Sequence, residues 1–214
     1  MFKGWLLCKP KFQNSYETQR LLEEFKNQDI KVKLIDPNEI DILMYSIGYC
    51  SSNGYSNRII IPSYDADGKL NYFIARDMFP NSRMKYKNPP MSKDTVCFEM
   101  FINWNEPIVL CEGVFDAIAI RRNVIPLLGK FPSKTLVMRL VEKKVKKIYV
   151  ALDRDAKKDA IKLSKFLMDY GIETYLLNME DKDPSELGFK NFWELLKNTK
   201  QSKFSDIIKG RLNV

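Results

Sequence analysis

Histidine is absent from this sequence of 214 residues, and its four cysteines are scattered without a C-x-x-C pair. A zinc site built from histidine and cysteine side chains is therefore not expected. Single cysteines of this kind are typical of reduced, mostly buried thiols in a cytoplasmic protein. No apolar run approaches the length of a membrane-spanning helix, and the apolar stretch near Trp5 is too short for a signal peptide.

Acidic residues are outnumbered by basic ones, 27 against 35, which gives the chain a net charge of +8. An excess of lysine and arginine favours a polyanionic partner such as nucleic acid. Lysine-rich composition also occurs without such a partner, so charge alone leaves both interpretations open. The length allows one large domain or two small ones.

The most informative pattern is an apolar run that ends in acidic residues, and it occurs twice. Residues 108–111 (IVLC) precede Glu112, and residues 148–152 (IYVAL) precede Asp153 and Asp155; residues with helical spacing follow each run. In an open parallel sheet, ligands bind in the crevice beyond the carboxyl ends of the strands. The three acids are therefore expected to converge there.

Three carboxylates in one small space raise each other's pKa unless a cation neutralises them. Ligand sets made only of oxygen atoms favour Mg²⁺ or Mn²⁺. The sequence thus predicts a magnesium or manganese site built from Glu112, Asp153 and Asp155.

The segments CEGVFDAIA (111–119) and ALDRDA (151–156) resemble the TOPRIM domain. Bacterial DnaG-type primases share that domain with topoisomerases, OLD-family nucleases and small RNA-processing nucleases. Farther upstream, NRIIIPSYDADGKLNYFIARD (57–77) and KYKNPP (85–90) resemble the stretch that precedes TOPRIM in DnaG-type and phage primases. The resemblance runs from about Tyr45 to Glu186, roughly two thirds of the chain.

Alternating strand and helix patterns predict an α/β fold. We expect a TOPRIM domain with a parallel sheet flanked by helices, preceded by a smaller β-rich α+β subdomain. The predicted domains are residues 1–41, a strand-helix-strand segment of unknown role; 42–105, a β-rich basic subdomain of a primase RNA-polymerase core; 106–185, the TOPRIM domain; and 186–214, a helical basic tail.

The predicted elements follow from apolar periodicity. A turn is expected at Asp65–Gly68, where Asp-x-Asp-Gly also suggests calcium but lacks the rest of an EF-hand loop. Strands are predicted at 58–62, 70–76, 108–111, 124–128, 147–152 and 173–179, and helices at 114–122, 134–143 and 156–170.

Basic residues accompany the predicted hairpin. The resemblance implies that Arg58, Arg76 and Lys85 handle nucleotide and DNA phosphates, whereas a single arginine is more often a solvated or salt-bridged surface residue. Tyr72, Phe73 and Tyr86 lie among them in the sequence, either to stack on unpaired bases or to fill the core. Just after Phe98, where the resemblance leads us to expect another basic residue, the chain has Glu99.

Further acids resemble members of the family's metal site. Asp116 follows Glu112 by one helical turn. It either lies at the same cleft as Glu112 or only interacts favourably with the dipole of its helix. Asp181 and Asp183 precede Pro184. They resemble the acidic motif that completes the family's metal site, but an Asp-Pro sequence is also common in ordinary turns.

The resemblance implies a DNA primase that makes short RNA primers on single-stranded DNA from ribonucleoside triphosphates. It implies two Mg²⁺ or Mn²⁺ ions, a replicative helicase or other replication protein as partner, and a bacterial or phage-infected cytoplasm. The metal ligands would be Glu112, Asp116, Asp153, Asp155 and Asp183.

Several parts of such primases are missing from the sequence. Residues 1–41 hold one cysteine and no histidine, so they are not the zinc module. Gly129-Lys130 lacks the flanking residues of a nucleotide-binding Walker motif, and no helicase-binding domain is recognised. A TOPRIM nuclease and an inactive nucleic-acid-binding subunit remain as alternative functions.

Overall fold

The computed structural model describes residues 45–50, 54–79, 81–178 and 182–202. The predicted strand-helix-strand segment 1–41, the end of the basic tail and Asp181 lie outside these residues. The chain divides into two units, residues 1–93 and 94–214. In the described part of the chain, no helix combines the length and the apolar character that crossing a membrane requires.

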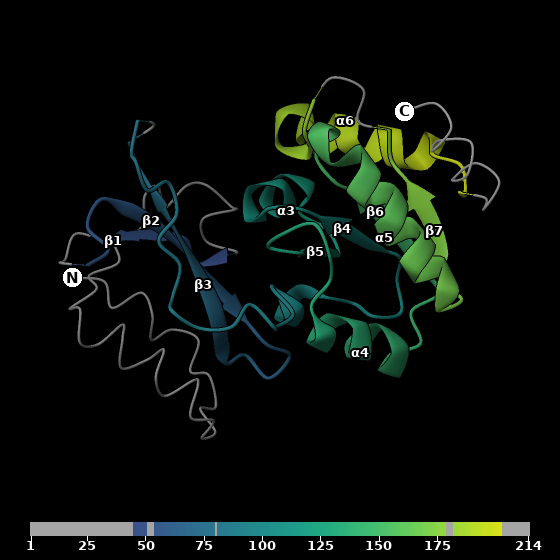
Figure 1. The fold of residues 1–214 in the computed structure, drawn as a ribbon, viewed down its shortest axis with the longest axis horizontal. Coiled ribbons are helices and arrows are strands. Elements are labelled where there is room, and N and C mark those ends of the chain that lie inside the picture. Colours follow the sequence, from purple (N-terminus) through teal and green to yellow (C-terminus); the bar gives the residue numbers. More distant parts are fainter. Residues whose placement is uncertain (1–44, 51–53, 80, 179–181, 203–214) are drawn as a thin grey trace. The chain divides into compact units, whose positions relative to one another are not determined.

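The first unit contains an antiparallel sheet in the order β1-β2-β3, seen in blue in Figure 1. Its strands are β1 (Gly48–Cys50), β2 (Arg58–Tyr64) and β3 (Leu70–Asp77). Neighbouring residues Ile60 and Ile61 are both fully buried, so β2 is covered on both faces. The predicted strands at 58–62 and 70–76 are confirmed, and each extends slightly farther.

The predicted hairpin turn between β2 and β3 is confirmed. Asp65 Oδ1 accepts hydrogen bonds from the backbone N–H groups of Asp67 (3.0 Å) and Lys69 (2.9 Å). Gly68 has a φ of +74°, a left-handed conformation that glycine adopts without a steric penalty. Asp65 and Asp67 are therefore residues of the turn, which the Asp65 side chain stabilises.

The register of β2 and β3 separates the two arginines that the sequence groups together. Arg58 lies opposite Asp77, and Arg76 lies opposite Ile59. Directly opposed residues share a face of the sheet and adjacent residues do not. Arg58 and Arg76 therefore stand on opposite faces of the hairpin.

The second unit contains a parallel sheet in the order β5-β4-β6-β7. Its strands are β4 (Ile108–Cys111), β5 (Val124–Pro126), β6 (Lys147–Ala151) and β7 (Glu173–Leu176), so every predicted strand is present. The chain runs from β4 outward to β5 and then returns to β6 on the other side of β4. This reversal creates a topological switch point between β4 and β6, where open α/β sheets bind ligands.

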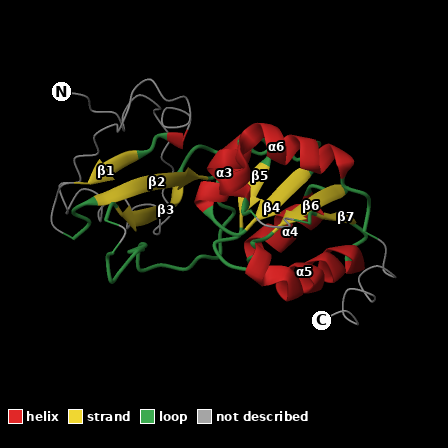
Figure 2. Ribbon diagram, turned by 90° about the horizontal axis from the view of Figure 1, so that it is seen from above, coloured by secondary structure: helices red, strands yellow, loops and turns green. Residues whose placement is uncertain are grey.

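Helices cover both faces of this sheet. Figure 2 shows α3 and α6 over one face and α5 over the other, as right-handed crossovers require. Where a single helix was predicted at 156–170, a short 3₁₀ turn, η3 (Arg154–Ala156), leads into α5. The helices are α3 (Val114–Ile120), α4 (Lys134–Glu142), α5 (Lys157–Asp169) and α6 (Pro184–Asn198).

The boundary between the units lies at Lys93–Asp94, whereas the sequence places it at 105–106. Val96 is part of the apolar core of the second unit, and Ile102 and Trp104 pack against that core. Asp94 Oδ1 accepts a hydrogen bond from the backbone N–H of Thr135 at 2.8 Å, at the start of α4. Residues 94–105, which include the 3₁₀ turn η2 (Glu99–Phe101), therefore belong structurally with the parallel sheet.

Candidate active site

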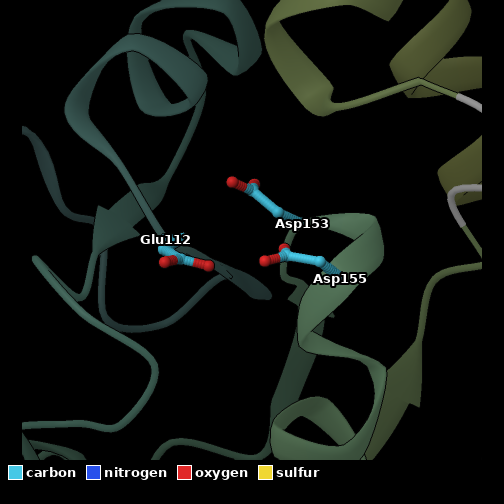
Figure 3. A group of neighbouring side chains, drawn as sticks. All are labelled: Glu112, Asp153 and Asp155. Carbon is cyan, nitrogen blue, oxygen red and sulfur yellow. The ribbon is translucent and has the colours of Figure 1, made fainter.

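Three acids meet at the carboxyl ends of the two central strands. Glu112 directly follows β4, and Asp153 and Asp155 follow β6, which pairs with β4 up to Cys111 opposite Ala151. One carboxylate oxygen from each acid lies within 4.8 Å of the other two. Figure 3 shows the carboxylates of Glu112 and Asp155 facing each other, with Asp153 beside them. The predicted convergence of these residues is confirmed.

Burial makes this cluster electrostatically unfavourable without a cation. Desolvation is the main reason why the pKa of Asp153 is raised to about 7, and the charges of Asp116 and Asp183 come next. Burial also raises the pKa of Glu112. Within the described part of the chain, Glu112 Oε2 and Asp153 Oδ1 are buried and accept no hydrogen bond. A bound cation would satisfy both oxygens and remove the repulsion between the acids.

The set of donor atoms suits a hard divalent cation. All three acids offer oxygen atoms, which Mg²⁺ and Mn²⁺ prefer. The nearby thiol of Cys111 is fully buried, and burial raises its pKa well above the usual range, so it stays protonated. Its Sγ–H donates to the carbonyl oxygen of Gly113 at 3.4 Å. The residues present therefore fit Mg²⁺ or Mn²⁺ better than zinc, which favours histidine and cysteine ligands.

Asp116 is buried in the first turn of α3, and desolvation raises its pKa. Its Oδ1 accepts a hydrogen bond from the backbone N–H of Ser185 at 3.2 Å. A Cβ atom at Gly113 would lie 3.1 Å from Asp116 Oδ2, so the glycine of the Glu-Gly pair makes room for this carboxylate. Asp116 lies close enough to Asp153 for its charge to act there, but its hydrogen bond also has a structural purpose.

Asp183 caps the start of α6, where the carboxylate of Glu186 accepts a hydrogen bond from the backbone N–H of Asp183 at 3.2 Å. Its charge raises the pKa of Asp153 and Asp116, so it lies near the cluster. It is not one of the three acids whose oxygens meet. Its assignment as a metal ligand remains a prediction.

Lys130 is a site residue that sequence reasoning missed. It follows β5, whose carboxyl end lies at the same edge of the sheet as those of β4 and β6. Its Nζ lies 3.6 Å from Asp159 Oδ2 and 3.9 Å from Asp155 Oδ2. The sequence showed Gly129-Lys130 only as an incomplete Walker motif, but its position after a strand could have indicated this location.

The basic residues of the first unit differ in what surrounds them. Arg58 is buried, 3.4 Å from Asp77 Oδ2, and donates a hydrogen bond to the carbonyl oxygen of Met84 at 2.9 Å. Lys85 is exposed at its side chain, while its carbonyl oxygen accepts from Arg58 at 3.4 Å. Arg58 therefore holds the segment after β3 in place, and its predicted phosphate contact remains untested.

Arg76 is exposed and stands beside an exposed ring. Its guanidinium donates to the hydroxyl of Tyr86 at 3.3 Å and lies 5.7 Å from the centre of that ring. Tyr72 and Phe73 are buried, so they belong to the core and do not offer stacking surfaces. Of the three aromatic residues considered for base stacking, only Tyr86 has the exposure that stacking needs.

Glu99, which stands where a basic residue was expected, is buried. Its Oε1 lies 2.9 Å from Arg139 Nε of α4. The acid thus belongs to an ion pair within the second unit and contributes no positive charge to a binding surface.

Known proteins resemble this chain in sequence and in fold. It is 30% identical over 144 residues to the uncharacterised protein MG010 of Mycoplasma genitalium, a match that covers 63% of this chain and 65% of the relative. No protein-family model matches the sequence. The zinc-binding and RNA polymerase domains of the Aquifex aeolicus primase give a TM-score of 0.64 at 20% identity, covering 86% of this chain and 57% of that one.

A structure of the DnaG primase catalytic domain bound to single-stranded DNA gives a TM-score of 0.61 at 16% identity. The match covers 88% of this chain and 65% of that one. The chain therefore spans between half and two thirds of these proteins. Its fold is that of the DnaG-type primase catalytic core, with a TOPRIM sheet and a preceding antiparallel sheet.

Proposed function

We propose that this chain catalyses primer synthesis, joining ribonucleotides on a single-stranded DNA template. The observation that carries the proposal is the meeting of Glu112, Asp153 and Asp155 at the switch point of a primase fold. Two of their buried carboxylate oxygens accept no hydrogen bond from the residues that the structure describes. A bound cation would compensate the charge of these oxygens. The likeness of the fold to primase catalytic cores favours nucleotidyl transfer as the reaction.

The reaction would join a ribose 3′-hydroxyl to the α-phosphate of an incoming ribonucleoside triphosphate and release pyrophosphate. Glu112, Asp153 and Asp155 are the residues that would hold Mg²⁺ or Mn²⁺, and a cation there would supply positive charge to offset that of the triphosphate and the leaving pyrophosphate. Asp116 and Asp183 add negative charge beside Asp153, which strengthens attraction for a divalent cation at that position. Most of the rate enhancement would come from proximity and charge stabilisation.

The template strand would bind the first unit through charge and stacking. Arg76 and Lys85 are exposed cations, and Tyr86 presents a ring that is 46% exposed. Lysine and arginine pair with phosphates in any sequence, while aromatic rings stack on unpaired bases. Arg58 would contribute by fixing the segment that carries Lys85 and Tyr86.

The remaining expectations follow from the same proposal. The substrates would be single-stranded DNA and ribonucleoside triphosphates, and a replicative helicase or another replication protein would be the partner. The protein would work in the cytoplasm of a bacterium or of a phage-infected host.

Primer synthesis can be tested directly with the purified chain. The assay incubates it with single-stranded DNA, labelled ribonucleotides and Mg²⁺ or Mn²⁺, and the products are resolved on a sequencing gel. Short ribonucleotide ladders that require metal and disappear in Asp153→Asn and Glu112→Gln would support the proposal. The matched control is Asp169→Asn. This substitution removes an exposed carboxylate at the C-terminal end of α5, about 18 Å along the helix axis from the N-terminal end near the acidic cluster.

Two other outcomes would replace this proposal with an alternative. Metal-dependent shortening of the DNA, lost in Asp153→Asn, would indicate a TOPRIM nuclease. Binding of DNA with neither product would indicate an inactive nucleic-acid-binding subunit.

A further inference from the structure

The ammonium group of Lys130 lies beside the acidic cluster. This group lies 3.9 Å from Asp155 Oδ2 and 3.6 Å from Asp159 Oδ2, and its charge also acts on Glu112. Lys162 approaches Asp159 as well, at 3.9 Å from Oδ1, but Asp155 is not among its ion-pair partners. Of these two lysines in the described part of the chain, Lys130 is the one within ion-pair distance of a converging acid.

Neutralisation within the cluster is therefore uneven. Among the three acids, the buried oxygens that accept no hydrogen bond from the described residues are Glu112 Oε2 and Asp153 Oδ1. Asp155 is different, because its side chain is 83% exposed and one of its oxygens faces an ammonium group. The unmet demand for positive charge is therefore greatest between Glu112 and Asp153.

We propose that Lys130 takes the place of a second divalent cation in this site. One Mg²⁺ or Mn²⁺ ion binds tightly through Glu112 and Asp153, and a second ion binds at Asp155 only by displacing the ammonium group of Lys130. This inference rests on the proposed metal site and specifies how many ions it holds.

The competing explanation is an ordinary surface ion pair, which usually contributes little to stability and adapts to its surroundings. In that case Lys130 would move aside at no measurable cost, and its removal would leave metal binding unchanged. The two explanations therefore differ in cation affinity, a quantity that can be measured without substrates or activity.

The experiment measures Mn²⁺ binding to the full chain by the loss of the electron paramagnetic resonance signal of free Mn²⁺. The wild-type protein is expected to bind one ion tightly. Lys130→Met is expected to gain a second site with an affinity at least about tenfold higher than any second site of the wild type, since a cation near a negative cluster opposes another cation strongly. Lys162→Met removes the same charge near Asp159 and should change affinity by less than about twofold.

Two aspartate variants provide a second measurement that does not depend on Lys130→Met folding. Asp153→Asn should abolish tight binding of the first ion. Asp155→Asn should leave the first ion bound within about threefold of wild-type affinity, because the Asp155 side chain is 83% exposed and solvent screens its charge. Circular dichroism would verify that each variant is folded.

The outcomes separate this inference from the proposed function. If the wild type binds one ion through Asp153 but Lys130→Met binds no more ions and no more tightly, the role of Lys130 is overturned while the metal site stands. Equal loss of the first ion in Asp155→Asn and Asp153→Asn would also overturn it. If neither the wild type nor Lys130→Met binds Mn²⁺, the proposed metal site itself fails.

Discussion

The backbone N–H of Ser185 donates a hydrogen bond to Oδ1 of Asp116 at 3.2 Å, across 69 positions of sequence. The bond joins the first turn of α6 to the first turn of α3. Trp193 Nε1 donates to the carbonyl oxygen of Ile120 at 3.1 Å and fixes the same pair of helices farther along. An acid of the candidate site thus also holds a helix in position.

Two substitutions of Asp116 separate its charge from its hydrogen bond. Asp116→Asn keeps an acceptor for Ser185 but removes a charge that raises the pKa of Asp153, so that pKa should fall. Asp116→Ala loses the acceptor, and the free energy of unfolding should fall by about 1–3 kcal/mol. Urea denaturation and carboxyl NMR titration measure the two effects. Equal free energies of unfolding for the two variants would argue against a structural role of the hydrogen bond between Ser185 and Asp116.

The stability of the metal-free protein should fall as the pH rises from about 4 to about 7. The folded-state pKa of Asp153 is raised to about 7 from an ordinary value of 3.8. Between these values the folded state retains a proton that the unfolded state releases, so rising pH favours unfolding. Above about 7 both states are ionised and this contribution no longer changes.

Thermal unfolding in the presence of EDTA, followed from pH 4 to pH 8, measures this effect. Asp153→Asn should flatten the decline, whereas Asp169→Asn should retain it. Adding Mn²⁺ at pH 8 should raise the midpoint of the wild type but not that of Asp153→Asn, because a ligand that binds only the folded state stabilises it. A wild-type profile that rises over this pH range would contradict the assigned electrostatics.

Arg58 and Arg76 should behave as a structural and a binding residue, respectively. Arg58→Met leaves the carbonyl oxygen of Met84 without its donor and should reduce the free energy of unfolding by about 1–3 kcal/mol. Arg76→Met alters an exposed side chain and should change stability by less than about 0.5 kcal/mol. Urea denaturation of both variants tests the contrast. Similar destabilisation by both would show that the register of the hairpin does not determine their roles.

Affinity for single-stranded DNA should depend on Arg76 and Lys85 through charge. Each phosphate contact that is lost should reduce the slope of log affinity against log salt by about 0.7. Fluorescence anisotropy with labelled oligonucleotides measures this slope. Salt is varied from about 50 to about 200 mM, because counterion release changes affinity markedly across that range. Lys146→Met, an exposed lysine of the second unit, serves as the control. Unchanged slopes for Arg76→Met and Lys85→Met would locate the DNA elsewhere.

Local sequence patterns predicted the parallel strands of the second unit. The strand at 108–111 was predicted with its observed bounds, because a parallel strand buried on both faces forms a continuous apolar run. The convergence of Glu112 with Asp153 could also be predicted, since parallel strands end at one edge of a sheet.

Long-range features were harder to predict. Arg58 looks like any exposed strand-end arginine until the register places it opposite Asp77. Lys130 carries no local motif, and its role depends on the return of the chain from β5 to β6. Residues 94–105 contain little regular structure, so no periodicity indicated that Val96 and Trp104 would pack with the parallel sheet.

The position of α6 against α3 has a consequence for how the protein is made. During translation at about 5–20 residues per second, Ser185 would emerge roughly 3–14 s after Asp116. Until then the nascent chain would present α3 without α6, which packs on it, and Asp116 without its hydrogen bond from Ser185. Ribosome-bound chains that end before α6 should therefore be more sensitive to proteases and more dependent on chaperones than chains that include it.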